Sequence, residues 1–149
     1  MNTAELNKLK QKAMDLLARR EHSRYELSQK LRDRDFAPDD IQAVLDQLEQ
    51  SNLLSDARFA ESYIMMRSQR GYGQLRIKQE LVERGVSENI IEAMLHEGAW
   101  EWASLLTRVH QKKFKHPPDD VEERNKQSQF LYYRGFTPDQ IKHFFKSIN

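Results

Sequence analysis

Apolar residues recur at helical spacing along nearly the whole chain, and no stretch shows the strict alternation that is typical of a β-strand. The first segment, residues 6–20, places its apolar residues on one face of a helix: Leu6, Leu9, Ala13, Leu16 and Leu17. Similar segments follow to the end of the chain, separated by residues that favour turns, such as Gly71-Tyr72-Gly73 and His116-Pro117-Pro118. The pattern therefore predicts an all-α protein.

The helical pattern repeats every fifty residues. A shift of fifty aligns Leu31 with Leu81 and Leu131, Arg34 with Arg84 and Arg134, Phe36 with Val86 and Phe136, Ala37 with Ser87 and Thr137, Ile41 with Ile91 and Ile141, Val44 with Met94 and Phe144, and Leu45 with Leu95 and Phe145. A register held over seven columns indicates an internal repeat. It predicts three tandem three-helix modules, at residues 1–54, 55–98 and 99–149, with the apolar columns buried.

Short motifs predict where several of these helices begin and end. Ser23-Arg24-Tyr25-Glu26 and Thr137-Pro138-Asp139-Gln140 are capping boxes, and Pro38 suits the first turn of a helix. Gly85 suits the left-handed position after a helix, and Ser87 suits the start of the next. The second and third helices of each module are thus joined by a tight turn, as in a helix-turn-helix. The expected architecture is about nine helices in an elongated array.

Composition agrees with such an array and excludes several classes of protein. Of 149 residues, 38% are hydrophobic and 32% are charged, which suits modules with much surface and small cores. The absence of cysteine excludes disulfides, thiolate nucleophiles and iron–sulfur clusters. No apolar run is long enough to span a bilayer, and the charged start lacks the apolar core of a signal peptide. We expect a cytoplasmic protein.

Catalytic and metal-binding patterns are missing from the sequence. Gly71-Tyr72-Gly73 follows no strand and has Arg76 where a dinucleotide fingerprint has its third glycine, so it is interpreted as an inter-helix loop. The five histidines lack metal-ligand spacing and are interpreted as solvated surface residues. Asp39-Asp40 and Asp119-Asp120 lie at predicted helix starts, where carboxylates favour the helix dipole. We expect no enzyme activity, no cofactor and no metal.

The charge distribution instead indicates binding. The predicted third helices of the first two modules, residues 38–49 and 88–97, contain no Lys or Arg, which argues against sequence-specific reading of DNA by all three modules. Basic residues gather in two other places. Arg67, Arg70, Arg76 and Lys78 flank Tyr72, and Arg108, Lys112, Lys113 and Lys115 end the seventh helix. The helix dipole favours cations near a helix C-terminus, which can explain Arg67, Arg70 and the three lysines, but it opposes Arg76 and Lys78 in the first turns of a helix. With Arg108 set aside, these basic residues and Tyr72 are the eight candidate partner- or DNA-binding residues.

Two segments resemble signatures of the RecX family of regulatory proteins. Residues 17–27 are similar to the family's "L-x-x-R-x-H-S-x-x-E-L" opening. Asp56-Ala57-Arg58-Phe59-Ala60, followed by Arg67 and Gly71-Tyr72-Gly73, resembles the second signature, which Ile77, Glu80-Leu81 and Arg84-Gly85-Val86 continue. The resemblance covers about residues 6–148, with the third module the looser match.

The resemblance implies a non-enzymatic modulator of RecA, the recombinase that polymerises on single-stranded DNA, and so a role in DNA repair, recombination and the SOS response. RecX proteins are similar helical arrays that lodge in the groove of the RecA filament and inhibit its recombinase, ATPase and coprotease activities. The resemblance implies that the basic loop and the Lys112–Lys115 cluster face the filament or its DNA. We expect a monomer. The alternative is a DNA- or RNA-binding regulator that acts through phosphate contacts alone.

Overall fold

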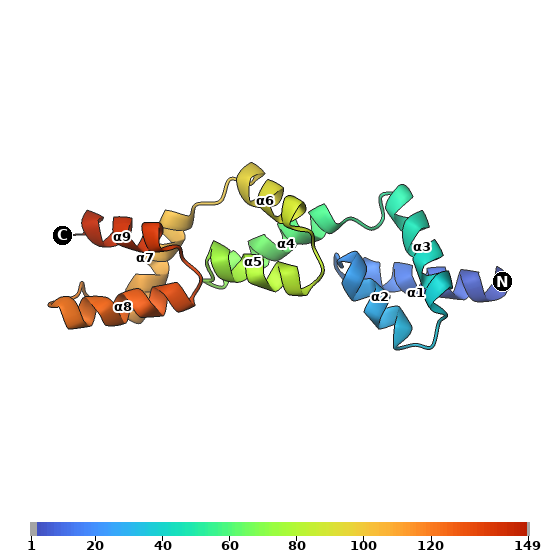
Figure 1. Ribbon diagram of the computed structural model, residues 1–149, viewed down its shortest axis with the longest axis horizontal. Coiled ribbons are helices and arrows are strands. Elements are labelled where there is room, and N and C mark those ends of the chain that lie inside the picture. The colour runs from blue at the N-terminus through green and yellow to red at the C-terminus, as the bar shows by residue number, and fades with distance from the viewer. Residues whose placement is uncertain (1–2, 149) are drawn as a thin grey trace. The chain divides into compact units, whose positions relative to one another are not determined.

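The structure of the chain is a computed structural model, and it describes residues 3–148 (Figure 1). Within that range it contains helices only. They are α1 (Thr3–Arg19), α2 (Arg24–Arg32), α3 (Pro38–Gln50), α4 (Asp56–Gln69), α5 (Gln74–Glu83), α6 (Glu88–Glu97), α7 (Trp102–Lys113), α8 (Val121–Tyr133) and α9 (Pro138–Ser147). The prediction of an all-α chain with about nine helices is confirmed for these residues.

Packing divides the chain into two compact units. The first contains Met1–Ser62 and Leu81–Met94, and the second contains Tyr63–Glu80 and Leu95–Asn149. Helices α1–α3 belong wholly to the first unit and α7–α9 wholly to the second, whereas α4, α5 and α6 each contribute residues to both. The module boundaries expected from the sequence, 1–54, 55–98 and 99–149, stay a prediction.

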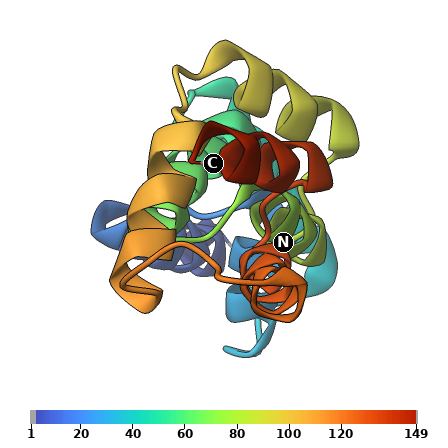
Figure 2. The same cartoon turned by 90° about the vertical axis from the view of Figure 1, so that its left-hand side faces the viewer.

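Helices α1, α2 and α3 pack against one another around an aliphatic core (Figure 1). Its buried residues are Leu9, Ala13, Leu16, Leu27, Leu31, Ile41, Val44, Leu45, Leu48 and Leu54. Helices α7, α8 and α9 pack in the same pairwise manner, and Figure 2 shows them in orange and red in front. The core of this second group mixes aliphatic and aromatic residues, and it contains Leu105, Leu106, Leu131, Phe136, Ile141, Phe144 and Phe145.

The fifty-residue register predicts many of the buried positions. Leu31, Leu81 and Leu131 are each fully buried, and Ile41, Ile91 and Ile141 are buried too. The expectation is wrong at Phe36, Met94 and Leu95, which are only partly buried because neighbouring side chains do not enclose these ends of the columns. The register also holds in the backbone. Asp35, Gly85 and Gly135 are fifty residues apart, and all three adopt a left-handed conformation, with φ of 64°, 79° and 104°. Each closes the turn after the second helix of its repeat, so the repeat is one of backbone geometry as well as sequence.

The predicted helix starts are confirmed. Ser23 Oγ accepts a hydrogen bond from the backbone N–H of Glu26, and the Glu26 carboxylate accepts one from the N–H of Ser23. Thr137 and Gln140 form the same reciprocal pair at α9. Pro38 and Pro138 both lie in the first turn of their helices. These local contacts satisfy backbone donors that a helix leaves unpaired at its N-terminus.

Two histidines contradict the expectation of solvated surface residues. His22 is only 2% exposed and His110 only 4%. The Lys30 ammonium donates to Nε2 of His22 at 2.9 Å, so the other ring nitrogen, Nδ1, carries the proton and donates to the carbonyl of Arg20. His110 lies among Phe114, Phe144 and Phe145, and its Nε2 pairs with the side-chain oxygen of Gln127 at 2.7 Å. Satisfied polar contacts explain how both rings can be buried.

Truncation of a buried repeat residue tests this packing. We expect Leu31→Ala to lower the free energy of unfolding by about 2–5 kcal/mol, because Leu31 is fully buried in the core of α1–α3. Leu53 is 44% exposed, and Leu53→Ala should change the free energy by about 0.5 kcal/mol or less. Chemical denaturation measures both. Similar losses in the two variants would contradict the assigned register.

The buried His22 predicts a loss of stability in mild acid. Burial lowers the pKa of His22 below its usual 6.5, more than the hydrogen bond to the Arg20 carbonyl raises it, and the nearby charges of Arg20 and Lys30 lower it further. The unfolded state therefore binds this proton more readily than the folded state, so the stabilising contribution is present above about pH 6.5 and is lost as pH falls. The free energy of unfolding should fall less steeply below that pH in His22→Asn than in the unchanged protein. Identical pH profiles would contradict this assignment.

Candidate functional site

All of the basic residues predicted to bind a partner lie in the second compact unit, and the structure shows that some of them form ion pairs. Arg67 on α4 is one of these. Its Nε and one terminal nitrogen each lie 2.9 Å from a carboxylate oxygen of Glu80 on α5. Tyr63 also donates to this carboxylate, at 3.0 Å. Partial burial would raise the pKa of Glu80, but the bonds from Arg67 and Tyr63 outweigh it and hold that pKa low. Arg67 thus fastens α4 to α5.

Three arginine side chains contact the ring of Tyr72. The guanidinium carbon of Arg67 lies 4.0 Å from the ring centroid, that of Arg76 lies 4.6 Å away and that of Arg134 lies 5.0 Å away. Arg76 also reaches the Glu80 carboxylate at 3.4 Å. Cations over an aromatic face are attracted by its quadrupole, so Tyr72 stabilises charges that would otherwise repel one another. The loop and its arginines form one structural cluster.

The backbone of this loop is fixed against the turn between α8 and α9. The N–H of Gly73 donates to the carbonyl of Arg134 at 2.7 Å, and the N–H of Leu75 donates to that of Gly135 at 2.9 Å. A side-chain bond of 2.8 Å joins Gln74 to Gln140. The two chains approach so closely that a β-carbon on Gly73 would overlap the backbone of Gly135 and Phe136. These contacts bring the end of α4 next to α7 and α8.

A surface cavity of about 430 Å³ lies at that junction. Its polar wall contains Arg70, Arg108, Lys112, Lys113 and Arg134. Leu105, Val109 and Phe130 supply apolar surface, and Gln69 and Gly71 complete the lining. Among residues 3–148, no carboxylate lines this cavity. We call it the cationic cavity.

The charges of the cationic cavity are not used in ion pairs. Within residues 3–148, none of its five basic side chains lies within ion-pair distance of a carboxylate, whereas Arg67 and Arg76 share Glu80. Lys113 and Arg134 instead lie over the ring of Phe130, at 5.4 and 5.2 Å from its centroid. Helix ends supply part of the reason for their placement, because Lys112 and Lys113 lie in the last turn of α7 and Arg134 caps the end of α8, where the helix dipole favours a cation. The dipole does not remove the repulsion among grouped cations that have no carboxylate partner, and an anionic ligand would relieve it.

The structure thus sorts the eight candidates. Arg70, Lys112 and Lys113 line the cationic cavity; Arg67, Tyr72 and Arg76 form the adjoining cluster. Lys78 and Lys115 lie outside the cavity lining. The eight candidates leave out two cavity residues, Arg108 and Arg134. Arg108 precedes Lys112 by one helical turn, which was an available signal. The sequence showed Arg134 only as the repeat equivalent of Arg34 and Arg84. Its position in the cavity depends on tertiary packing.

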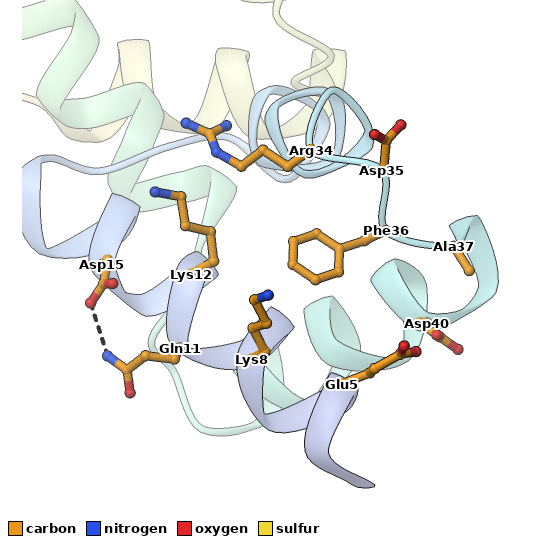
Figure 3. A pocket seen from close by; sticks show the side chains of 10 residues that line it. All are labelled: Glu5, Lys8, Gln11, Lys12, Asp15, Arg34, Asp35, Phe36, Ala37 and Asp40. Atoms are coloured by element: carbon orange, nitrogen blue, oxygen red, sulfur yellow. Dashed lines mark hydrogen bonds between the residues drawn. The ribbon is translucent and has the colours of Figure 1, made fainter. Parts of the chain in front are cut away.

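A second and larger cavity, of about 790 Å³, lies in the first unit between α1 and the turn that joins α2 to α3 (Figure 3). The ring of Phe36 projects into it between the basic side chains of Lys8, Lys12 and Arg34. Four carboxylates also line it, from Glu5, Asp15, Asp35 and Asp40, and Asp15 accepts a hydrogen bond from Gln11 at 2.8 Å. This mixture of charges contrasts with the cationic cavity.

Comparison with known proteins shows the same tandem architecture. Residues 10–48 match the model of the first three-helix domain of RecX, residues 55–95 match the second, and residues 101–145 match the third. The chain belongs to the RecX family. Curated RecX relatives include the regulatory protein RecX of Pseudomonas fluorescens Pf-5, which is 47% identical over 87% of this chain and 84% of its own. Regulatory protein RecX of Pseudomonas entomophila L48 is 49% identical with the same coverage.

Solved RecX structures support the fold. The crystal structure of RecX from Lactobacillus salivarius has a TM-score of 0.82 and 24% sequence identity, and the match covers 98% of this chain and 97% of that one. A second RecX crystal structure gives a TM-score of 0.78 over 95% of this chain and 71% of its own. The resemblance to the RecX family, the three tandem three-helix domains and the non-enzymatic, regulatory character expected from the sequence are confirmed by these relatives.

Two further observations concern the described residues. None of their His, Asp and Glu side chains gather in threes in a way that would hold a metal ion. No helix among residues 3–148 combines the length and the apolar character needed to cross a membrane.

Substitution of Gly73 tests how the cationic cavity is held together. Gly73→Ala would place a methyl group against the backbone of Gly135 and Phe136, so we expect a loss of about 1–3 kcal/mol in the free energy of unfolding. Ser104→Ala, on the exposed side of α7, should change it by about 0.5 kcal/mol or less. Denaturation with both variants measures the difference, and an unchanged Gly73→Ala protein would contradict the close approach of the loop to the α8–α9 turn.

Proposed function

We propose that this protein binds the filament that RecA forms on single-stranded DNA and inhibits its recombinase, ATPase and coprotease activities. Membership of the RecX family supports a regulatory role directed at RecA. In this proposal the protein acts as a monomer in the cytoplasm, without cofactor or metal, and contacts DNA only weakly.

The observation that carries the proposal is the set of cavity cations that no carboxylate neutralises. A RecA filament presents both protein surface and DNA phosphates. The phosphates would attract a surface whose cations have no carboxylate partners. Complementary charge mainly raises the rate of encounter and sets the register of docking. We therefore assign the largest share of the contact to Arg70, Lys112 and Lys113. Arg67 and Arg76 support the surface through Glu80 and Tyr72.

The composition of the third helices of the first two repeats argues against sequence-specific recognition of DNA. Helix α3 has Asp39 and Asp40 in its first turn and no basic residue in its last, and α6 has Glu88 in its first turn. Neither helix contains Lys or Arg, the residues that most often read guanine in the major groove. Only α9, with Lys142 and Lys146, has basic residues in that position. This distribution favours docking on a nucleoprotein filament over the reading of base sequence.

The alternative function is a regulator that binds bare nucleic acid through phosphates alone. It rests on the same cationic cavity. The two functions differ in their preferred partner, because a phosphate binder should bind bare single-stranded DNA as tightly as a RecA–DNA filament, with a steep dependence on salt.

Charge reversal tests the proposal. We expect Arg70→Glu with Lys113→Glu to raise the concentration needed for half-inhibition of RecA-driven ATP hydrolysis by about tenfold, because repulsion replaces two attractive contacts. The charge-matched control Lys142→Glu with Lys146→Glu lies on α9 in the same unit and should shift it by about twofold or less.

A second control is Asp39→Asn with Asp40→Asn, at the start of α3, which should leave inhibition near normal. Full inhibition by the Arg70, Lys113 variant would remove the cationic cavity from the contact surface. Equal binding of the unchanged protein to bare DNA and to filaments would favour the phosphate-binding alternative.

A further inference from the structure

The cationic cavity combines two kinds of wall that together fit one class of ligand. The polar part of its lining includes Arg70, Arg108 and the two lysines at the end of α7. The apolar part includes Phe130, whose ring packs edge-on against Phe114 with centroids 5.4 Å apart and an interplanar angle of 89° and has Lys113 and Arg134 nearby. Leu105 and Val109 extend this apolar side. A ligand that matches both walls has an anionic group joined to a flat or apolar one.

The polar wall suits phosphate in particular. Guanidinium groups present several N–H donors in a planar fork that matches phosphate oxygens, and lysine adds compact positive charge. The cavity offers both types: Arg70 follows the end of α4, Arg108 and Lys112 lie on α7, and Arg134 caps the end of α8. Cations that converge from three separate segments differ from a row of solvated charges on one helix face.

The apolar wall distinguishes a nucleotide from a simple anion. Aromatic side chains stack with nucleic-acid bases regardless of sequence, and such stacking contributes substantially to binding of single strands. Phe130 is half-buried and reaches the cavity surface between Lys113 and Arg134. A volume of about 430 Å³ lies within the usual ~300–1,000 Å³ range for small-molecule sites. This volume has room for one nucleotide unit.

We propose that the cationic cavity is a nucleotide-binding pocket, which holds the phosphate of one nucleotide unit on Arg70, Arg108 and Lys112 and its base against Phe130. The unit comes either from a single-stranded nucleic acid or from a free nucleotide, since both present the same chemistry. This pocket is a property of the isolated chain and does not depend on the proposed action on RecA.

Direct binding measurements on the full chain, without RecA, test the pocket. Three probes share negative charge but differ in the base and the strand: inorganic tripolyphosphate, ADP without a metal ion, and a fluorescently labelled oligothymidylate. We expect Arg108→Glu with Lys112→Glu to weaken the binding of all three by at least about tenfold at low salt. Lys142→Glu with Lys146→Glu, which carries the same change in net charge on α9, should weaken it by about twofold or less.

Phe130→Leu separates a nucleotide pocket from a simple anion site. It keeps an apolar side chain but removes the stacking face, so ADP and oligothymidylate should bind several-fold more weakly while tripolyphosphate is unaffected. Arg70→Ala provides an independent variant just after the end of α4, and helicity measured by circular dichroism shows whether each variant is folded.

Each outcome decides the proposal. If ADP binds at least as tightly as the oligothymidylate, the natural ligand is a free nucleotide. If only the oligothymidylate binds, the ligand is a single strand. Both results support the pocket. Equal weakening by the two double variants would show a diffuse field instead of a site, and an unaffected Phe130→Leu protein would show an anion site only. Displacement of the oligomer by polyglutamate as readily as by tripolyphosphate would indicate an acidic peptide. Any of these three results, or no binding of any probe, overturns the proposal.

Discussion

The second unit depends on one close approach, between the backbone at Gly73 and the turn at Gly135. Two backbone hydrogen bonds, from Gly73 to Arg134 and from Leu75 to Gly135, join the start of α5 to the end of α8. Neither glycine tolerates a β-carbon there without a shift of neighbouring backbone or of Arg76. This contact brings Tyr72 next to Arg134, and it also places the end of α4 beside α7 and α8. The cationic cavity is a consequence of that packing.

The same unit shows how a protein can hold many cations close together. Glu80 neutralises Arg67 and Arg76 by short ion pairs, and Tyr72 receives three guanidinium groups on its ring. The cations of the cavity have no such compensation from carboxylates in the described chain. Arg67 and Arg76 therefore have a structural role through Glu80, and Arg134 has one through the ring of Tyr72. Arg70, Arg108, Lys112 and Lys113 have no carboxylate partner among residues 3–148.

Polar contacts inside the first unit follow a related principle. Ser23 caps α2 and also donates to the carbonyl of Arg84, and the N–H of Arg24 donates to the carboxylate of Asp56. Burial raises the pKa of Asp56, more than this hydrogen bond lowers it. His22, the neighbour of Ser23, is buried with both ring nitrogens satisfied. The His-Ser pair of the family signature is thus a structural element of this fold, which explains two adjacent buried polar residues without any catalytic role.

The sequence by itself determined the helices, their caps and the buried columns, because these depend on contacts within a few residues and on a period that repeats three times. Leu31, Leu81 and Leu131 could be placed in cores, and Gly85 in a left-handed turn, from spacing alone. It also identified Arg70, Lys112 and Lys113 as candidates. Tertiary structure alone decided which cations are paired, since Arg67 meets Glu80 thirteen residues away and Arg134 meets Tyr72 from another repeat. It likewise decided the burial of His22 and His110, because the partners that satisfy a ring nitrogen come from packing, which periodicity does not encode.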